Sequence, residues 1–136
     1  MNLAQAFNLY DPMNILRIAC GLLFIPHLFV KFQNQDFVKD FLTKVRMRPP
    51  MLWLYAAFLI EIVATIGLVF AIYTAHVALL AGVFLLFASW ASWKFSGGKW
   101  VWNFGGAEYP LFWAIACFVL AMHYWPAEGL WAAIAM

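Results

Sequence analysis

MLWLYAAFLIEIVATIGLVFAIY, residues 51–73, is the stretch that decides the fold of this chain. A helix needs about 20 apolar residues to cross a hydrocarbon core of about 30 Å, and this stretch is long enough. Glu61 lies near its centre. A carboxylate at that depth costs at least about 2.5 kcal/mol. We therefore expect Glu61 to face the protein interior and to have either a partner or a proton.

The composition points to an integral membrane protein. The 136 residues are 67% hydrophobic and only 10% charged, and a soluble domain of this size has too little interior to bury so much apolar surface. The net charge is only +2 and Lys and Arg form no run, which argues against a nucleic-acid partner. Because the Cys, His and acidic residues lack metal-ligand spacing, we expect no metal site.

The apolar stretches predict an all-α fold: an integral membrane four-helix bundle in a single transmembrane domain, residues 1–136. The segment after the first span has apolar residues at helical spacing on one side and charged residues on the other. It is too short to cross, so we expect a short amphipathic helix in the membrane interface. The tail after the last span is also too short and is interpreted as a surface helix. The predicted spans are about 13–30, 51–73, 76–93 and 111–125, and the predicted interfacial helix is about 36–46.

The positively charged residues predict the orientation. With four spans, the first and third loops share one side and hold the Lys and Arg residues that lie outside the apolar stretches. Because cytoplasmic loops are enriched in Lys and Arg, we expect those loops inside the cell and both termini outside the cytoplasm.

Several ionisable side chains accompany Glu61 in the spans. Arg17 lies about one helical turn inside the first span, where it can pair with Glu61 or extend to the lipid headgroups. His27 and Lys31 are four residues apart and meet near the cytoplasmic end of that span. Glu108 enters the membrane at the same depth, so a bridge from Lys31 to Glu108 is expected. Two interpretations of Glu61 remain open, a static structural acid or a ligand- or proton-binding group.

Three fragments of the chain resemble the DoxX family of small four-helix bacterial membrane proteins. They are LRIACGLLFIPHLFVKF, IEIVATIGLVF and FGGAEYPLFWAI. The family pattern has an Arg in the first span with a His and a Lys after it, an acid in the second span, and Gly-Gly-x-Glu-Tyr before the last. The corresponding residues here are Arg17, His27, Lys31, Glu61, Gly105, Gly106, Glu108 and Tyr109.

The chain departs from the family pattern in two places. Leu28 stands where the family usually has Gly after the His, and the usual Gly-Pro-Gly and Ser-Leu-Asp ending is replaced by WPAEGLWAAIAM. The resemblance implies a multi-pass protein of the bacterial inner membrane that associates with redox complexes. Some members of the family are described as subunits of thiosulfate:quinone oxidoreductase or of terminal oxidases.

From these observations the leading hypothesis is a DoxX-like membrane subunit of a respiratory or redox complex that holds a quinone headgroup in a polar pocket. No redox cofactor is encoded in a recognisable motif, so electrons would come from a partner, and the chain is at most an oxidoreductase subunit. Phe24 and Trp113 are candidates to flank the quinone ring. The proposed ligand-binding residues are Arg17, His27, Lys31, Glu61, Glu108 and Tyr109, with Gly105 and Gly106 as motif residues.

Two other functions remain open at this point. The chain can be a non-catalytic accessory subunit that packs against a larger membrane complex, with its polar groups serving only to hold the bundle together. It can also be a small-solute or proton carrier, although so short a chain shows neither broken helices nor inverted repeats. In each case the expected partners are membrane lipids and either a larger membrane protein complex or further copies of the chain.

Overall fold

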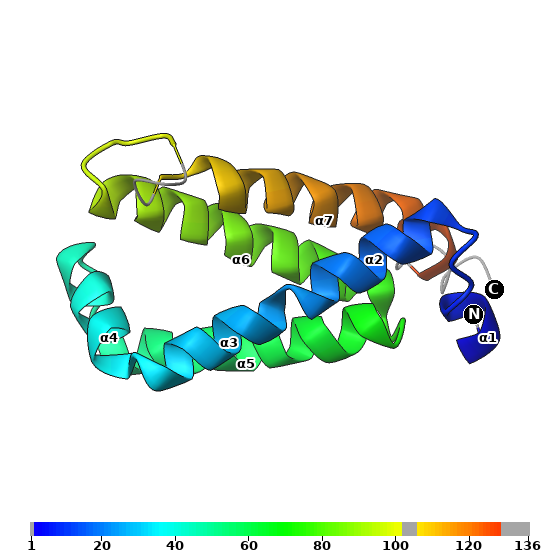
Figure 1. The fold of residues 1–136 in the computed structure, drawn as a ribbon, viewed down its shortest axis with the longest axis horizontal. Helices are drawn as coiled ribbons and strands as arrows, with labels where there is room; N and C mark the ends of the chain where they lie inside the picture. Colours follow the sequence, from blue (N-terminus) through cyan, green and yellow to red (C-terminus); the bar gives the residue numbers. More distant parts are fainter. Residues whose placement is uncertain (1, 102–105, 129–136) are drawn as a thin grey trace.

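A computed structural model describes residues 2–101 and 106–128 of the chain, and every regular element in these ranges is an α-helix (Figure 1). Four segments are long and apolar enough to cross a membrane, namely 12–33, 50–69, 74–95 and 108–127. The chain is therefore a multi-pass membrane protein, and the predicted all-α bundle is confirmed. The helices are α1 (Leu3–Ala6), α2 (Pro12–Leu22), α3 (Phe24–Gln33), α4 (Gln35–Lys44), α5 (Pro50–Val69), α6 (Thr74–Phe95) and α7 (Glu108–Glu128).

The four spans form two layers. Helices α6 and α7 pack side by side along their length, and α3 packs against α5 on the opposite side of the bundle (Figure 1). Helix α2 connects the layers because it packs against both α5 and α7. The short helix α4 closes one end of the bundle, and α1 lies at the other end (Figure 1).

The first span is two helices rather than the single helix that the sequence analysis describes. Helix α2 ends at Leu22 and α3 begins at Phe24, with Leu23 between them. Pro26 explains the break, because its ring has no N–H to donate to the carbonyl of Leu22 and clashes with that carbonyl in a regular helix. The consequence is that α3 packs on α5, whereas α2 also packs on α7.

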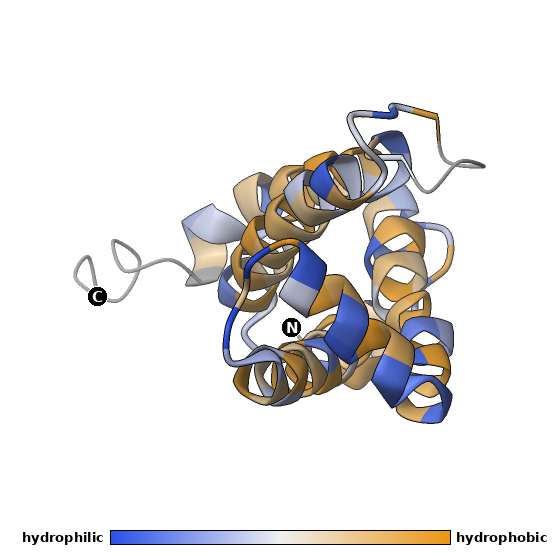
Figure 2. Cartoon of the chain, turned by 90° about the vertical axis from the view of Figure 1, so that its left-hand side faces the viewer, coloured by the Kyte–Doolittle hydropathy of each residue, from blue (hydrophilic) through white to orange (hydrophobic). Residues whose placement is uncertain are grey.

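Local signals account for where several helices begin. The carboxylate of Asp11 accepts a hydrogen bond from the Met13 N–H at 3.0 Å, and Pro12 occupies the first position of α2. Pro50 occupies the equivalent position in α5. Helix α4 is amphipathic: its Leu42 is buried, and hydrophilic residues gather on it when the bundle is viewed from that end (Figure 2).

Helices pack closely near the α5–α6 connection. A Cβ atom on Gly21 of α2 would lie 3.0 Å from the Leu68 side chain of α5, and one on Gly67 would lie 2.7 Å from Val77 of α6. Small residues of this kind let helix backbones approach each other inside a membrane. Many of the buried core residues on α6 and α7 are likewise alanines.

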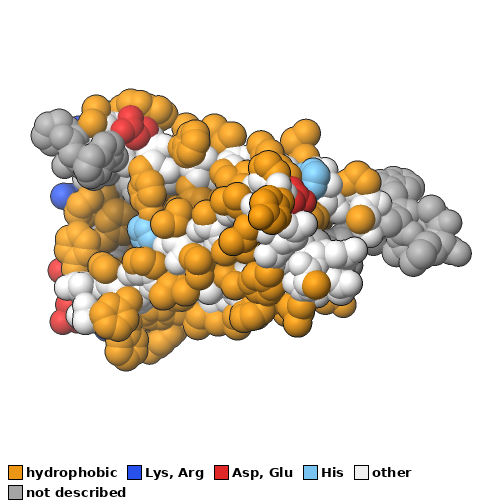
Figure 3. Space-filling view, turned by 45° about the vertical axis from the view of Figure 1, so that its right-hand side comes forward, with side chains coloured by type: hydrophobic (Ala, Val, Ile, Leu, Met, Phe, Trp, Pro, Cys, Tyr) orange, Lys and Arg blue, Asp and Glu red, His pale blue; other side chains and the backbone are white. Residues whose placement is uncertain are grey.

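The outer surface suits a hydrocarbon environment. Hydrophobic side chains cover most of the face drawn in Figure 3, and charged side chains show mainly toward its ends. In water such a surface would be an aggregation hazard, whereas in a bilayer it is the expected boundary with lipid. Residue Gly105 and the end of the predicted C-terminal surface helix lie outside the described residues.

Candidate functional site

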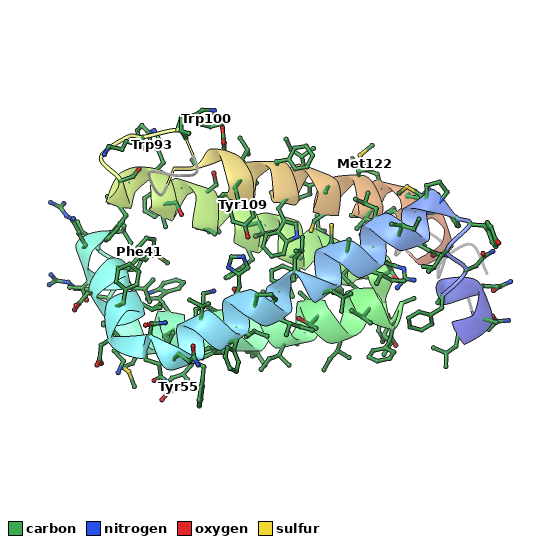
Figure 4. The ribbon with its side chains drawn as sticks, in the orientation of Figure 1. Phe41, Tyr55, Trp93, Trp100, Tyr109 and Met122 are labelled. Carbon is green, nitrogen blue, oxygen red and sulfur yellow. The ribbon has the colours of Figure 1, made fainter. Side chains whose placement is uncertain are left out.

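A cavity of about 600 Å³ lies between the two layers at the α4 end of the bundle. Its volume falls within the range of about 300–1,000 Å³ that is typical of small-molecule sites, and its lining is mostly apolar with a few polar groups. Figure 4 shows Phe41 and Tyr109 pointing into the space between the layers, whereas Tyr55 and Met122 point away from it. The polar side chains that line the cavity are His27, Lys31, Asn34, Glu61, Ser92 and Tyr109.

Glu61 forms an ion pair with Lys31 on the lining of the cavity. The Lys31 ammonium donates a hydrogen bond to Glu61 Oε1, which joins α3 to α5. The ammonium also lies 5.3 Å from the centre of the Phe84 ring on α6. Glu61 Oε2, in contrast, is buried and has no hydrogen-bond partner among the described residues. A buried acceptor without a donor is costly, so this oxygen needs a donor that the described residues do not supply.

His27 and Tyr109 form a second polar contact, this time between α3 and α7. The Tyr109 hydroxyl and His27 Nε2 share a hydrogen bond, and the two rings are stacked with centroids 5.7 Å apart. The Trp113 ring lies 5.3 Å from His27 and 5.8 Å from Tyr109. The indole N–H of Trp113 is buried and interacts with the thiol of Cys20, a residue that does not line the cavity. His27, Tyr109 and Trp113 therefore form an aromatic cluster on the cavity lining.

Arg17 lies outside this cavity, at the α1 end of the bundle. Its guanidinium is fully buried and donates hydrogen bonds to the backbone carbonyls of Leu68 and Val69 in α5, and to that of Ala6 in α1. The last four carbonyls of a helix lack partners within the helix and carry its partial negative charge. They take the place of the carboxylate partner that the sequence analysis considered, and no pair between Arg17 and Glu61 forms in the structure.

Glu108 also lies outside the cavity. It is half-buried at the start of α7 and lines a separate outer pocket with Trp100 and Phe112. The expected bridge from Lys31 to Glu108 is absent from the described residues, because Lys31 pairs with Glu61. Consecutive residues of a helix point in different directions, so the neighbouring Tyr109 faces the cavity while Glu108 does not. Gly106 also lines the cavity.

Several lining residues were not singled out from the sequence. Asn34 and Phe41 reach the cavity because the connection between α3 and α4 turns α4 across its end, and Phe84 and Ser92 come from α6. Pro26 was the available signal, since it breaks the first span and separates α3 from the other layer. Within residues 2–101 and 106–128, no group of three or more His, Cys, Asp or Glu side chains is arranged to hold a metal ion.

Comparison with known proteins gives one result on family membership. The model of the DoxX family matches residues 13–93, which is more than half of the chain. The match includes both partners of the Lys31–Glu61 ion pair and ends before Tyr109. No curated protein and no solved structure matches the chain.

Proposed function

This chain belongs to the DoxX family, and from that premise we propose that its cavity binds the headgroup of a quinone as part of a membrane redox assembly. One observation carries the proposal: a mostly apolar cavity of about 600 Å³ is lined by the Lys31–Glu61 ion pair and by Trp113, and Glu61 Oε2 has no hydrogen-bond partner among the described residues. A ligand that accepts a hydrogen bond from Lys31 and donates one to Glu61 satisfies both groups.

The two oxidation states of a quinone match these groups. The oxidised ring accepts hydrogen bonds at its carbonyl oxygens, for which the Lys31 ammonium is a donor. The reduced ring carries hydroxyl groups that donate, for which Glu61 Oε2 is an acceptor. The aromatic rings of Trp113 and Phe84 also line the cavity and suit a flat ligand ring.

Reduction of a quinone takes two electrons and two protons. In this proposal Glu61 carries one of the two protons to or from a ring oxygen, and the Lys31 ammonium balances the carboxylate charge when that proton leaves. The described side chains supply no electron carrier, so a partner protein of the assembly provides or removes the electrons. We place the chain in the bacterial inner membrane with both termini outside the cytoplasm, which sets the cavity in the cytoplasmic half.

Purification in mild detergent from the native membrane tests this proposal, with bound quinone measured by chromatography per mole of chain. The parent chain should retain quinone, and Glu61→Gln should lose it while remaining folded. Glu108→Gln is the matched control, because it makes the same chemical change outside the cavity. Stoichiometric membrane-protein partners without quinone would overturn the proposal in favour of an accessory subunit that uses the Lys31–Glu61 pair only for packing.

A further inference from the structure

The cavity extends from its polar end into the space between α5 and α6. Each helix contributes a stripe of lining residues with the spacing i, i+3, i+7, which places the three residues on one face. All six side chains are apolar. We name these two stripes the portal: Trp53, Ala56 and Ile60 on α5, and Leu80, Val83 and Phe87 on α6.

The portal opens to the outside of the bundle. Its three α6 residues, Leu80, Val83 and Phe87, are 41%, 43% and 60% exposed although they line the cavity, and Trp53 on α5 is 42% exposed. Helices α5 and α6 approach each other near their connecting turn, where a Cβ atom on Gly67 would lie 2.7 Å from Val77. Further from that turn the cavity lies between them.

Contacts between side chains bridge the other sides of the cavity. The hydrogen bond between His27 and Tyr109 joins α3 to α7. Phe41 of α4 packs on Phe95 of α6 with ring centroids 4.7 Å apart. The Lys94 ammonium donates a hydrogen bond to the carbonyl of Val45 at 3.3 Å, which holds the end of α4 against α6. None of these three contacts joins α5 to α6 along the portal.

The portal lies at the depth of the lipid hydrocarbon. Ala56 and Ile60 belong to the middle of the 20-residue helix α5, and Leu80 and Phe87 to the middle of the 22-residue helix α6. A molecule that enters here comes from the bilayer and not from water. An ordinary phospholipid does not fit the polar end, because its headgroup stays at the membrane surface rather than near Glu61.

From this arrangement we infer that the ligand is a membrane-resident molecule with a long hydrocarbon tail. Its head lies between Glu61 and Trp113, and its tail extends through the portal into the bilayer. The inference rests on the proposed quinone site for the identity of the head. The substrate class is then a quinone with a long tail. Ala56 contributes to the selection of such a quinone, because a small side chain at this position leaves room for the tail.

The test compares two probes in nanodiscs, a quinone ring without a tail and the same ring with a long isoprenoid tail. Ala56→Phe should fill the portal and lower the affinity for the tailed quinone by at least about tenfold, which corresponds to the burial of about two methylene groups. Its affinity for the tailless ring should change by less than about twofold, because the head site is left intact. Ala19→Phe is the matched control, since Ala19 is exposed on α2 and does not line the cavity.

The outcomes separate this inference from the proposed function. If neither probe binds the parent chain, the quinone site itself fails. If both probes bind and Glu61→Gln weakens both, while Ala56→Phe weakens neither or weakens the two equally, the head site stands and the portal is overturned. A thermal melt of each variant in the same nanodiscs shows that a lost affinity is not a lost fold.

Discussion

Arg17 and Glu61 are both buried within the spans, yet their polar atoms have different surroundings. The guanidinium of Arg17 binds three backbone carbonyls from α1 and α5, and only its Nε lacks a partner among the described residues. Glu61 uses one oxygen for Lys31 and leaves the other beside a cavity. The α1 end thus uses its buried charge to hold helices together, whereas at the α4 end one carboxylate oxygen has no partner among the described residues, as the proposed ligand site requires.

The largest loss of stability is expected when the hydrogen bonds of Arg17 at the α1 end are removed. Arg17→Met leaves the carbonyls of Leu68, Val69 and Ala6 without donors, and the expected loss of stability is about 3–5 kcal/mol. Thermal unfolding in detergent measures it. Arg17→Lys should lose less, because an ammonium still donates to some of the carbonyls. An unchanged melting temperature for Arg17→Met would show that these hydrogen bonds do not support the fold.

A second pair of substitutions compares the packing at the two ends of the bundle. Gly67→Ala puts a methyl group against Val77, and overpacking of this kind costs about 1–3 kcal/mol. Ala88→Val also adds bulk, but on the lining of the cavity, and should cost less than about 1 kcal/mol. Both values come from thermal unfolding under the same conditions. Equal costs at the two positions would mean that the α4 end is packed as tightly as the other.

A third substitution should lower the affinity for the ligand without unfolding the bundle. Glu61→Gln keeps a hydrogen-bonding oxygen for Lys31 but removes the charge, and quinone affinity should fall at least about tenfold, or about 1.4 kcal/mol. Quinone titration of the purified chain measures the affinity. Arg17 binds three backbone carbonyls, whereas Glu61 pairs through one oxygen only. The melting temperature of the ligand-free Glu61→Gln chain should therefore fall far less than that of Arg17→Met. A fall in melting temperature as large as that of Arg17→Met would instead show that Glu61 serves to stabilise the fold.

The smallest effect is expected for Tyr109→Phe. This variant keeps the ring beside His27 and Trp113 and removes the hydroxyl, which costs about 0.5–1.5 kcal/mol for one lost hydrogen bond. Quinone affinity should fall only a few-fold, since the hydroxyl of Tyr109 is already hydrogen-bonded to His27. A loss as large as that of Glu61→Gln would instead make the hydroxyl a direct ligand contact.

The sequence was sufficient for the class of fold and for much of the candidate site. Apolar stretches of membrane-spanning length gave the all-α bundle, and the need to partner Glu61 pointed to the first span. The sequence could not choose between Lys31 and Arg17 as that partner. The choice depends on the break at Pro26, which separates the direction of α3 from that of α2.

The part that the sequence could not predict depends on tertiary contacts. Arg17 is bound by backbone carbonyls more than 50 residues away, and every residue has such a carbonyl, so no side-chain pattern reveals the contact. The cavity likewise arises from the separation of α5 and α6 and from α4 lying across the end. Helical spacing identifies the apolar faces of these segments but not the volume between them.

The most direct test of the central claim is photo-crosslinking with an azido-quinone in native membranes, followed by mass spectrometry of the labelled peptides. The account predicts labelling of the cavity lining, at residues such as Phe84, Tyr109 and Trp113, that excess unlabelled quinone abolishes and that Glu61→Gln greatly reduces. Labelling centred on Arg17 and α1, or labelling of the cavity that unlabelled quinone does not compete away, would contradict the assignment of the ligand site to the α4 end.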